Sequence, residues 1–563
     1  MRNPFCFIRV TFPAPLSTKA SVTTGWTLKP YFVTTPIFYP NADPHIGHLY
    51  SMVLADILAR YSRLRHPLRQ VAFSTGTDEH GLKIQQAAKE NYLSPPELCT
   101  GLLCRHQLYE VHPNNGQGPY FSSQAILVDR GYIYKGTHSG WYSVSDECFY
   151  PESQVTKFKD PQTGERYMAQ ISKETGQRVE WSEEENYKFK LSSFRRPLIT
   201  IRPEPYYHFV LNSLINDESA TQDLSVSRPR SRLEWGIQVP GDSEHTIYVW
   251  LDALVNYLTV AGYPDNTTAW PADVSVIGKD IIRFHTIYWP AFLFALDLPA
   301  PTTLLTHGHW TRDRQKMSKS RGNVTNPFTA MGHNSDGTPK QRLAAPGMQQ
   351  GEIDVGVDGV RWYMLRAGGT FDTDSDMSRI DWSSNQVRKH YQRELAGSLG
   401  NLLFRITAPR LVARLPPVDL TLRPSVIFNE VHSDDASINQ SLKQLPSIVD
   451  RYMENFQIGR VLEAVVDCLN EANRHITQLE PWRHDSNTEV VMRAHKYSAE
   501  ALRIIGIILQ PFIPSKADQL LTQLGVSYDD RGWQDTALWK GDPSIGRMAP
   551  GAQQLFPRLK SIV

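Results

Sequence analysis

Residues 34–64 read TTPIFYPNADPHIGHLYSMVLADILARYSRL, and this stretch predicts a strand that passes through a turn into a helix. The segment PYFVTTPIFY is rich in β-branched and aromatic residues, as is typical of a buried strand. Apolar residues then recur at helical spacing from Ile46 to Tyr61, so we expect an amphipathic helix. Asp43 suits the N-cap of that helix, and Pro44 suits its first position.

Two histidines lie at the start of the expected helix. His45 and His48 are three residues apart, so they share one face of its first turn. A helix N-terminus has unpaired N–H groups and partial positive charge, and it therefore binds anions. Gly47 has no Cβ, so a flat ligand can approach the backbone closely. Two ordinary histidines at a helix cap are the alternative, but the coincidence of all these features favours a phosphate site.

The composition is that of an ordinary soluble protein with several domains. The chain has 563 residues, of which 40% are hydrophobic, and its net charge is +1, so charge alone does not indicate nucleic-acid binding. No apolar run is long enough to span a membrane, and no membrane partner is expected. The five cysteines form no C-x-x-C pair, which argues against both a disulfide framework and a cysteine zinc knuckle.

The N-terminal segment has a composition of its own. No Asp or Glu precedes Asp43, whereas Arg2, Arg9 and Lys19 are spread among Ser, Thr and apolar residues. Such an acid-free segment predicts a mitochondrial transit peptide over residues 1–28, with a disordered start as the alternative.

The order of patterns predicts an α/β fold: a Rossmann-like parallel-sheet domain with a small inserted domain, followed by an all-α bundle. Strand and helix patterns alternate over residues 29–128 and resume over 226–330. Residues 129–225 are aromatic and turn-rich, which indicates the inserted domain. Residues 331–386 form a connecting region, and helical patterns dominate 387–563.

A second cationic segment, RDRQKMSKSRGN, occupies residues 312–323. Lys316 and Lys319 supply positive charge, and Ser318 and Ser320 supply hydroxyl donors. Alone, the segment is a solvated basic loop, but it follows a strand of the α/β domain that contains HIGH. Because ligands bind at the carboxyl ends of parallel strands, two cationic segments there suggest a nucleoside triphosphate site.

PHIGH followed far downstream by KMSKS resembles the class I aminoacyl-tRNA synthetases. Six blocks in order narrow the resemblance to the methionyl-tRNA synthetase family in its mitochondrial form. These blocks are TTPIFYPNADPHIGHLYS, STGTDEHGLKIQQAA, DLSVSRPRSRLEWGIQVPGD, HTIYVWLDALVNYL, GKDIIRFHTIYWPAF and HGHWTRDRQKMSKSRGNV. The resemblance covers most of residues 30–410, with weaker similarity beyond, and it implies that 331–386 is a stem-contact region.

The resemblance implies a two-step ligase reaction. Methionine attacks the α-phosphate of ATP to give methionyl-adenylate and pyrophosphate, and the methionyl group then passes to the 3′-terminal adenosine of tRNA(Met). His45 and His48 are expected to steady the phosphates, while Lys316 and Lys319 hold the departing pyrophosphate, Lys319 most directly. Catalysis is then positioning and electrostatics without a nucleophilic side chain, and Mg²⁺ accompanies the ATP.

The resemblance also implies two binding sites. The residues expected to bind ATP are His45, Gly47, His48, Asp280, Lys316, Ser318, Lys319 and Ser320. The residues expected to bind methionine are Ile37, Tyr39, Asp78, Trp250, Leu254, Tyr257, Phe284 and His285. Asp78 would hold the ammonium group, and the aromatic residues suit a polarizable thioether. Core packing is the alternative role for Trp250, Tyr257 and Phe284.

Three residues of the helical region resemble the anticodon readers of the family. Asn401 and Arg405 are four residues apart on one helix face, and Trp482 follows another helix. An unstacked base needs an aromatic surface and hydrogen-bonding groups at its edge. Packing at a helix end is the alternative role for Trp482.

The sequence departs from the family at three places. The inserted domain, residues 129–225, contains a single cysteine, Cys148, which fits the branch of the family without structural zinc. The segment near residues 100–128 is short, which predicts the loss of a strand from the nucleotide-binding sheet. Residues 331–356 form an insertion that reads as a surface loop. Either of the last two could be an error in the gene model.

Two other functions remain open from the sequence. Another class I synthetase is one, although the chain is too short for the editing domain of the branched-chain enzymes. A noncatalytic tRNA-binding protein is the other, because of the short segment near 100–128. We expect a monomer in the mitochondrial matrix, since no appended tRNA-binding module is evident.

Overall fold

The protein is described here from a computed structural model that divides into two compact units. Unit 1 comprises Met1–Ala55 and Arg69–Gly308, and unit 2 comprises Asp56–Leu68 and His309–Val563. The structure describes the chain except for residues 1–28, 42, 107–122, 124, 144–147, 151, 160–167, 174–175, 195–199, 217–220, 266, 313–314, 318–323, 334–354, 369–378, 416–430, 541–553 and 560–563.

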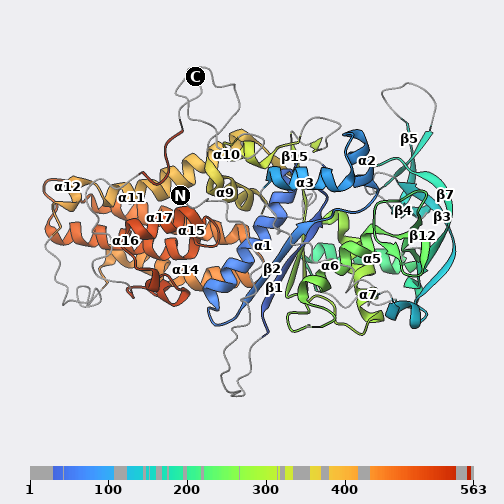
Figure 1. Ribbon diagram of the computed structural model, residues 1–563. Helices are drawn as coiled ribbons and strands as arrows, with labels where there is room; N and C mark the ends of the chain where they lie inside the picture. The colour runs from blue at the N-terminus through green and yellow to red at the C-terminus, as the bar shows by residue number, and fades with distance from the viewer. Residues whose placement is uncertain are drawn as a thin grey trace, which may run out of the picture. The chain divides into compact units, whose positions relative to one another are not determined.

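Unit 1 is built on a five-stranded parallel sheet with the order β2-β1-β13-β14-β8. Its strands are β1 (Tyr31–Phe38), β2 (Val71–Thr77), β8 (Thr200–Arg202), β13 (Val274–Gly278) and β14 (Thr303–His307). Strands β1 and β2 run side by side (Figure 1). The strand predicted in PYFVTTPIFY is confirmed, and its buried Phe32 and Val33 explain the apolar sequence.

Helices follow the strands in the manner of a doubly wound sheet. The helical elements of unit 1 are α1 (Ile46–Arg65), α2 (Leu82–Glu90), α3 (Pro95–His106), α5 (Glu204–Asn216), α6 (Val249–Ala261), η4 (Lys279–Ile281), the π-helix η5 (Phe284–Tyr288) and α7 (Trp289–Ala295). Helix α1 continues into unit 2 from Asp56. Apolar side chains of α6, η5 and α7 share one core cluster with those of β13 and β14.

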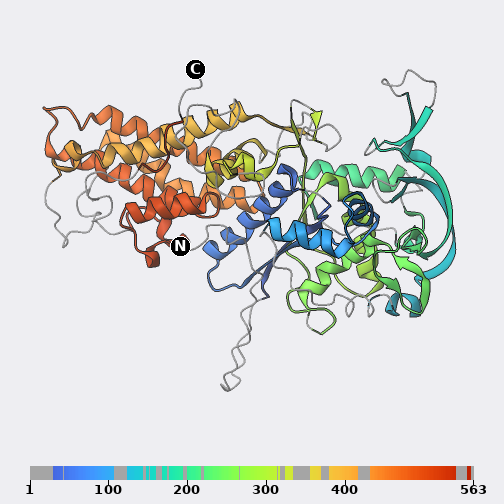
Figure 2. The ribbon, with the colours of Figure 1, turned by 45° about the horizontal axis from the view of Figure 1, so that its top comes forward.

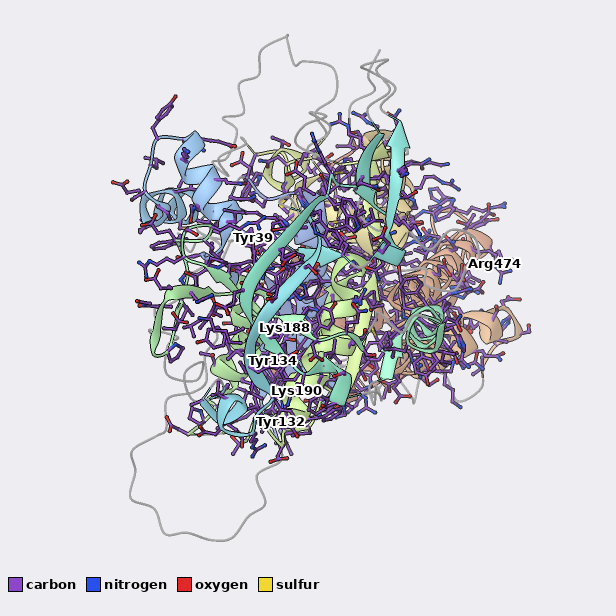
Figure 3. The ribbon with its side chains drawn as sticks, turned by 90° about the vertical axis from the view of Figure 1, so that its right-hand side faces the viewer. Tyr39, Tyr132, Tyr134, Lys188, Lys190 and Arg474 are labelled. Carbon is purple, nitrogen blue, oxygen red and sulfur yellow. The ribbon has the colours of Figure 1, made fainter. Side chains whose placement is uncertain are left out.

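The middle of unit 1 contains smaller antiparallel sheets. One has the order β4-β3-β7-β9, one has the order β10-β12-β11, and β5 and β6 form a two-stranded ribbon. Their bounds are β3 (Ile133–Ser143), β4 (Cys148–Tyr150), η1 (Glu152–Gln154), β5 (Val155–Lys159), β6 (Met168–Ser172), β7 (Glu180–Phe189), η2 (Leu191–Ser193), β9 (Leu224–Ser225), β10 (Ser227–Pro229), β11 (Gln238–Val239) and β12 (Asp242–Ile247). On the long β3–β7 pair, Tyr134 lies opposite Lys188 and beside Lys190, so that two ammonium groups approach one ring (Figure 3).

Unit 2 combines a small sheet with many helices. Its sheet has the order β16-β15-β17, with β15 (His309–Arg312), β16 (Gln315–Lys316) and β17 (Arg379–Trp382). Its helical elements are α8 (Pro327–Ala330), α9 (Gly356–Gly368), α10 (Ser384–His390), the π-helix η7 (Tyr391–Gly400), α11 (Asn401–Ile406), α12 (Pro409–Val412), η8 (Ser433–Asp435), α14 (Ala436–Glu454), α15 (Ile458–Leu479), α16 (Thr488–Leu509), α17 (Pro514–Gln523), η9 (Tyr528–Asp530) and η10 (Trp533–Thr536).

The long helices α14, α15 and α16 pack against one another as a bundle (Figure 2). Helix α15 buries a stripe of apolar residues from Ile458 to Ile476, and α16 is buried along most of its length. No helix in the described parts of the chain is long and apolar enough to cross a membrane.

The predicted fold class is confirmed: a parallel sheet flanked by helices in one unit and a helical region towards the C-terminus. The predicted domain boundaries stay predictions. The segments expected to be shortened or inserted coincide largely with residues 107–122 and 334–354, which lie outside the described residues.

Candidate active site

The carboxyl ends of the parallel strands in unit 1 bring several predicted residues to one edge of the sheet. Ile37 lies near the end of β1, Asp78 directly follows β2, and Asp280 lies in η4 just after β13. The pairing of β1 with β2 shifts register between Thr34 and Ile37. Because the strands are parallel, these chain positions share the edge at which such sheets bind ligands.

The histidine pair at the start of α1 is packed ring to ring. The ring centroids of His45 and His48 are 3.7 Å apart and their planes are 25° apart, while Phe38 lies 5.0 Å from His48. The two rings lie side by side as predicted, but His45 precedes the first residue of α1 and so is not part of its first turn.

The predicted helix start was wrong, because α1 begins at Ile46 rather than at Pro44. The ring of His45 itself caps the helix: its Nδ1 accepts hydrogen bonds from the backbone N–H groups of Gly47 (3.1 Å) and His48 (3.4 Å). An Nδ1 that accepts cannot carry the proton, so neutral His45 has its hydrogen on Nε2. That N–H is a donor suited to a phosphate oxygen.

Gly47 leaves the space that this ring occupies. A Cβ at residue 47 would lie 2.9 Å from Cε1 and 3.0 Å from Nδ1 of His45. The sequence suggested that glycine serves the close approach of a ligand, whereas the structure shows that it first serves the close approach of the neighbouring imidazole.

A hydrogen-bonded chain joins two of the residues predicted to bind methionine, Tyr257 and His285. His285 Nδ1 is 2.9 Å from the carbonyl of Ile281, so it donates there, and His285 Nε2 accepts from the hydroxyl of Tyr257 at 2.8 Å. Burial lowers the pKa of His285 to about 4, and burial raises the pKa of Tyr257. Both side chains are therefore neutral near pH 7.

An aromatic stack lies beside the core cluster that contains Tyr257. Trp250 and Phe284 stack with their centroids 4.2 Å apart, and Leu254 of α6 is buried in the cluster with Tyr257. The indole Nε1 of Trp250 is buried and has no hydrogen-bond partner among the described residues. This N–H could donate a hydrogen bond to an acceptor atom of a ligand.

The remaining predicted methionine residues are not in that cluster. Tyr39 is half-buried against a separate apolar cluster around Ile84 and Leu98, with the ammonium of Lys83 4.7 Å from its ring (Figure 3). Ile37 is half-buried near the end of β1 and belongs to neither cluster. The structure thus packs Leu254, Tyr257 and Phe284 in one cluster. Trp250 stacks on Phe284, and His285 is hydrogen-bonded to Tyr257.

The loop after β2 is acidic and partly buried. Asp78 is 4% exposed, and its backbone N–H donates to the carbonyl of Phe38 at 2.9 Å. Burial and the charges of Glu79 and Asp78 raise the pKa of nearby Cys99 to about 12. Negative potential of this kind favours a cation such as an ammonium group. Asp280, in contrast, is exposed.

Sequence reasoning missed two hydrogen-bonded histidines in this region. His307, at the end of β14, lies 2.7 Å from the hydroxyl of Ser51 on α1 and so ties the sheet to that helix. His80 lies 2.7 Å from the carboxylate of Asp252 on α6. Burial lowers the pKa of His80, but the bond to Asp252 raises it overall. The signal was available, since both histidines lie in blocks that carried the family resemblance.

Most of the KMSKS segment lies outside the described residues. The backbone of Lys316 belongs to β16 and pairs with Thr311 of β15, and its side chain is not described. Ser318, Lys319 and Ser320 fall within the undescribed residues 318–323.

The three predicted anticodon residues do come together in unit 2. The guanidinium carbon of Arg405 lies 5.1 Å from the centroid of the Trp482 ring, and Trp482 is 50% exposed. Arg405 donates to the hydroxyl of Thr477 at 3.0 Å, and Asn401 lies 3.5 Å from the side chain of Asn473. An exposed ring beside a guanidinium is a surface on which a base can stack.

In the described part of the chain, no group of three or more His, Cys, Asp or Glu side chains is placed to hold a metal ion. The absence of structural zinc stays a prediction.

Comparison with known proteins first defines the class. The family model described as "tRNA synthetases class I (M)" matches residues 31–111 and 121–337. The interruption at residues 112–120 falls in the segment that the sequence showed to be short.

Relatives and solved structures then define the family. The probable mitochondrial methionine–tRNA ligase of Neurospora crassa is 40% identical over 93% of this chain and 85% of its own length. The mitochondrial methionine–tRNA ligase of Homo sapiens is 40% identical over 94% of this chain and 91% of its own length. The structure of Mycobacterium tuberculosis methionyl-tRNA synthetase bound by methionyl-adenylate aligns with a TM-score of 0.78 at 30% identity, covering 94% of this chain and all of that one. The chain therefore belongs to the class I methionine–tRNA ligases.

Proposed function

We propose that this enzyme joins methionine to the 3′-terminal adenosine of tRNA(Met) in two steps. A carboxylate oxygen of methionine attacks the α-phosphorus of ATP, the bond to the bridging oxygen breaks, and pyrophosphate leaves. A ribose hydroxyl of the terminal adenosine then attacks the activated carbonyl carbon, and AMP leaves. The family membership supports this reaction, and it does not favour a noncatalytic tRNA-binding protein.

The observation that carries the choice of amino acid is the buried, neutral hydroxyl–imidazole pair of Tyr257 and His285. A thioether is uncharged, polarizable and a weak hydrogen-bond acceptor, so it suits aromatic rings and a neutral hydroxyl–imidazole pair. A charged side chain would lose its hydration there without gaining a counter-ion. We assign Ile37 and Tyr39 to the same site as its outer wall, and Asp78 to the ammonium group.

The proposed roles at the phosphates follow from charge and hydrogen-bond donors. Nε2–H of His45 and the ring of His48 would donate to phosphate oxygens at the N-terminus of α1. Lys316 and Lys319 would hold the leaving pyrophosphate. Mg²⁺ would arrive with ATP as its counter-ion. Gly47, Asp280, Ser318 and Ser320 complete the proposed ATP site.

The proposed partner in unit 2 is the anticodon of tRNA(Met), read by Asn401, Arg405 and Trp482. The mitochondrial names of the relatives support a mitochondrial location, and we propose the matrix as the compartment, with residues 1–28 as the address. We propose that the enzyme acts as a monomer.

The decisive experiment is ATP–pyrophosphate exchange by the chain without residues 1–28, with each amino acid in turn. Exchange with methionine alone is expected, and strong exchange with another amino acid would contradict the proposed substrate. Tyr257→Phe removes only the donor to His285 and should raise the KM for methionine roughly tenfold, since a buried polar group loses its partner. Tyr207→Phe, on the exposed face of α5, is the matched control and should leave that KM unchanged.

A further inference from the structure

Trp482 lies in a short loop, Glu480–Ser486, between helices α15 and α16. Its ring is half exposed, so few contacts of the ring itself hold it in place. A base-stacking surface works only if its orientation is set before the RNA arrives, because ordering it on binding costs conformational entropy. Some other group must therefore fix the backbone of this loop.

Arg414, directly after α12, supplies that group. Its Nη1 donates to the carbonyl oxygens of Pro481 (2.6 Å) and Arg483 (2.8 Å), and its Nη2 donates to the carbonyl of Ser486 (2.6 Å). Pro481 and Arg483 are the residues immediately before and after Trp482. One guanidinium thus holds the backbone on both sides of the tryptophan and the far end of the loop.

The chemistry of arginine suits this task. A guanidinium is planar, always charged and has five N–H donors in a fixed geometry, so it can satisfy several carbonyls at once. Hydrogen bonds from a charged donor are also stronger than neutral ones. An ammonium group at the same place could reach one or two of the carbonyls, but it could not reproduce the planar arrangement of donors that a guanidinium offers to all three.

Within the described parts of the chain, the loop's other hydrogen bonds are internal to it. Ser486 donates through its hydroxyl to the carbonyl of Glu480 (2.9 Å), and Arg483 pairs with Glu480 through its side chain (2.9 Å). These bonds shape the loop but do not attach it to α12. Arg414 makes that attachment, while Arg405 of α11 approaches the face of the Trp482 ring.

We propose that Arg414 is a positioning residue for RNA recognition: it orients Trp482 for stacking on an anticodon base without touching the RNA. This inference rests on the proposed role of Trp482. It predicts that loss of Arg414 weakens tRNA binding only because Trp482 is no longer held in place. Methionine activation should be unchanged.

The test compares Arg414→Met with Arg410→Met. Arg410 is an exposed arginine of α12, the short helix that precedes Arg414. It makes no hydrogen bond or ion pair among the described residues, so its variant controls for the loss of one positive charge. Arg414→Met should raise the KM for tRNA(Met) in aminoacylation roughly tenfold, the size of a lost stacking contact. Arg410→Met should change it less than about threefold. Methionine-dependent ATP–pyrophosphate exchange should be unchanged in both. Equal tRNA KM values for the two variants would overturn the proposal.

A double-variant cycle shows whether Arg414 acts through Trp482. If it does, adding Arg414→Met to Trp482→Ala changes the tRNA KM by less than about twofold beyond Trp482→Ala alone. If the double variant instead shows the product of the two separate effects on the tRNA KM, the positioning role of Arg414 is overturned. An unchanged KM in Trp482→Ala itself would instead contradict the proposed reading role of Trp482.

Arg414→Lys keeps the experiment decisive if Arg414→Met lowers the melting temperature. The lysine variant retains charge and most of the apolar stem, so it should remain folded. A tRNA KM between those of the wild type and Trp482→Ala is then expected, whereas a wild-type KM would overturn the proposal.

Discussion

The imidazole of His45 has two nitrogen atoms with different hydrogen-bonding roles. Nδ1 accepts from the first N–H groups of α1, so neutral His45 carries its hydrogen on Nε2, which we propose as the donor to a phosphate. The helix cap therefore sets the tautomer of a proposed catalytic side chain. Sequence spacing placed both histidines on one face, but it could not give the ring orientation, because that depends on side-chain torsions.

Gly47→Ala tests this arrangement at the scale of one residue. The added Cβ would meet the His45 ring at 2.9 Å, so the ring must leave its cap. We expect kcat for ATP–pyrophosphate exchange to fall by about tenfold or more, with little change in melting temperature, because a misplaced donor loses transition-state stabilisation.

Gly136→Ala is the control for this substitution. A Cβ there would make only ordinary contacts, the nearest 3.5 Å from the ring of Tyr134. Wild-type exchange activity in Gly47→Ala would show that the cap is irrelevant to activation.

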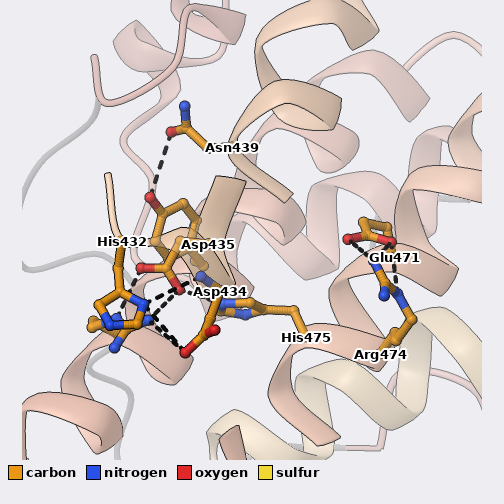
Figure 4. A network of polar contacts seen from close by, with 9 residues as sticks. His432, Asp434, Asp435, Asn439, Glu471, Arg474 and His475 are labelled. Atoms are coloured by element: carbon orange, nitrogen blue, oxygen red, sulfur yellow. Dashed lines mark hydrogen bonds and ion pairs between the residues drawn. The ribbon is translucent and has the colours of Figure 1, made fainter. Parts of the chain in front are cut away.

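At the scale of elements, the helical bundle of unit 2 is joined by a buried polar network centred on Asp435 (Figure 4). Its carboxylate accepts from Nε2 of His475 on α15 (2.8 Å) and from Nε and Nη2 of Arg493 on α16 (both 2.8 Å). All three side chains are 5% exposed or less. A buried charge is tolerated only when it is paired in this way.

Asp435→Asn should destabilise the bundle by about 3 kcal/mol, because it leaves the buried Arg493 with only the distant, exposed carboxylate of Asp434 as a counter-ion. In scanning calorimetry we expect a melting transition lower by roughly 5–10 °C. The neighbouring Asp434 is 58% exposed and lies 3.9 Å from Arg493, so Asp434→Asn should change the transition by only about 1–2 °C. Equal shifts for the two variants would contradict this account.

The same network predicts a dependence on pH. Burial raises the pKa of Asp435, but the hydrogen bonds from Arg493 and His475 outweigh it and hold the pKa below its usual value. The unfolded chain therefore binds the proton more readily. The stabilisation is present above the unfolded pKa of about 3.9 and is lost as pH falls through the lower folded value. Asp435→Asn should show less of this acid-dependent loss than the wild type.

At the scale of the whole molecule, residues 1–28 are predicted to contain the mitochondrial targeting signal and to be dispensable for activity. Fused to a reporter, they should direct it to mitochondria, since an acid-free segment with spread arginines is what the import machinery accepts. The chain without them should remain in the cytosol with unchanged methionine-dependent exchange, measured after fractionation. Import of the shortened chain would contradict the assignment.

Much of this molecule follows from local sequence. The strand at 31–38, the helix beginning near the histidine pair and the helical C-terminal region are all visible as patterns of apolar spacing, because burial of one face imposes that spacing. The six motif blocks identify the family, and 40% identity to its members agrees with them.

Only the tertiary structure decided which of the residues that match the family motifs pack together. Tyr39 packs in a different cluster from Tyr257 and Phe284, although all three fit one motif set. Arg414 attaches to a loop almost seventy positions further along the chain, as its bonds to Pro481 and Arg483 show. The physical reason is that apolar periodicity reports burial, a property of each element alone. Hydrogen bonds between distant side chains and carbonyls depend on how the folded chain brings those elements together, and no local pattern records that.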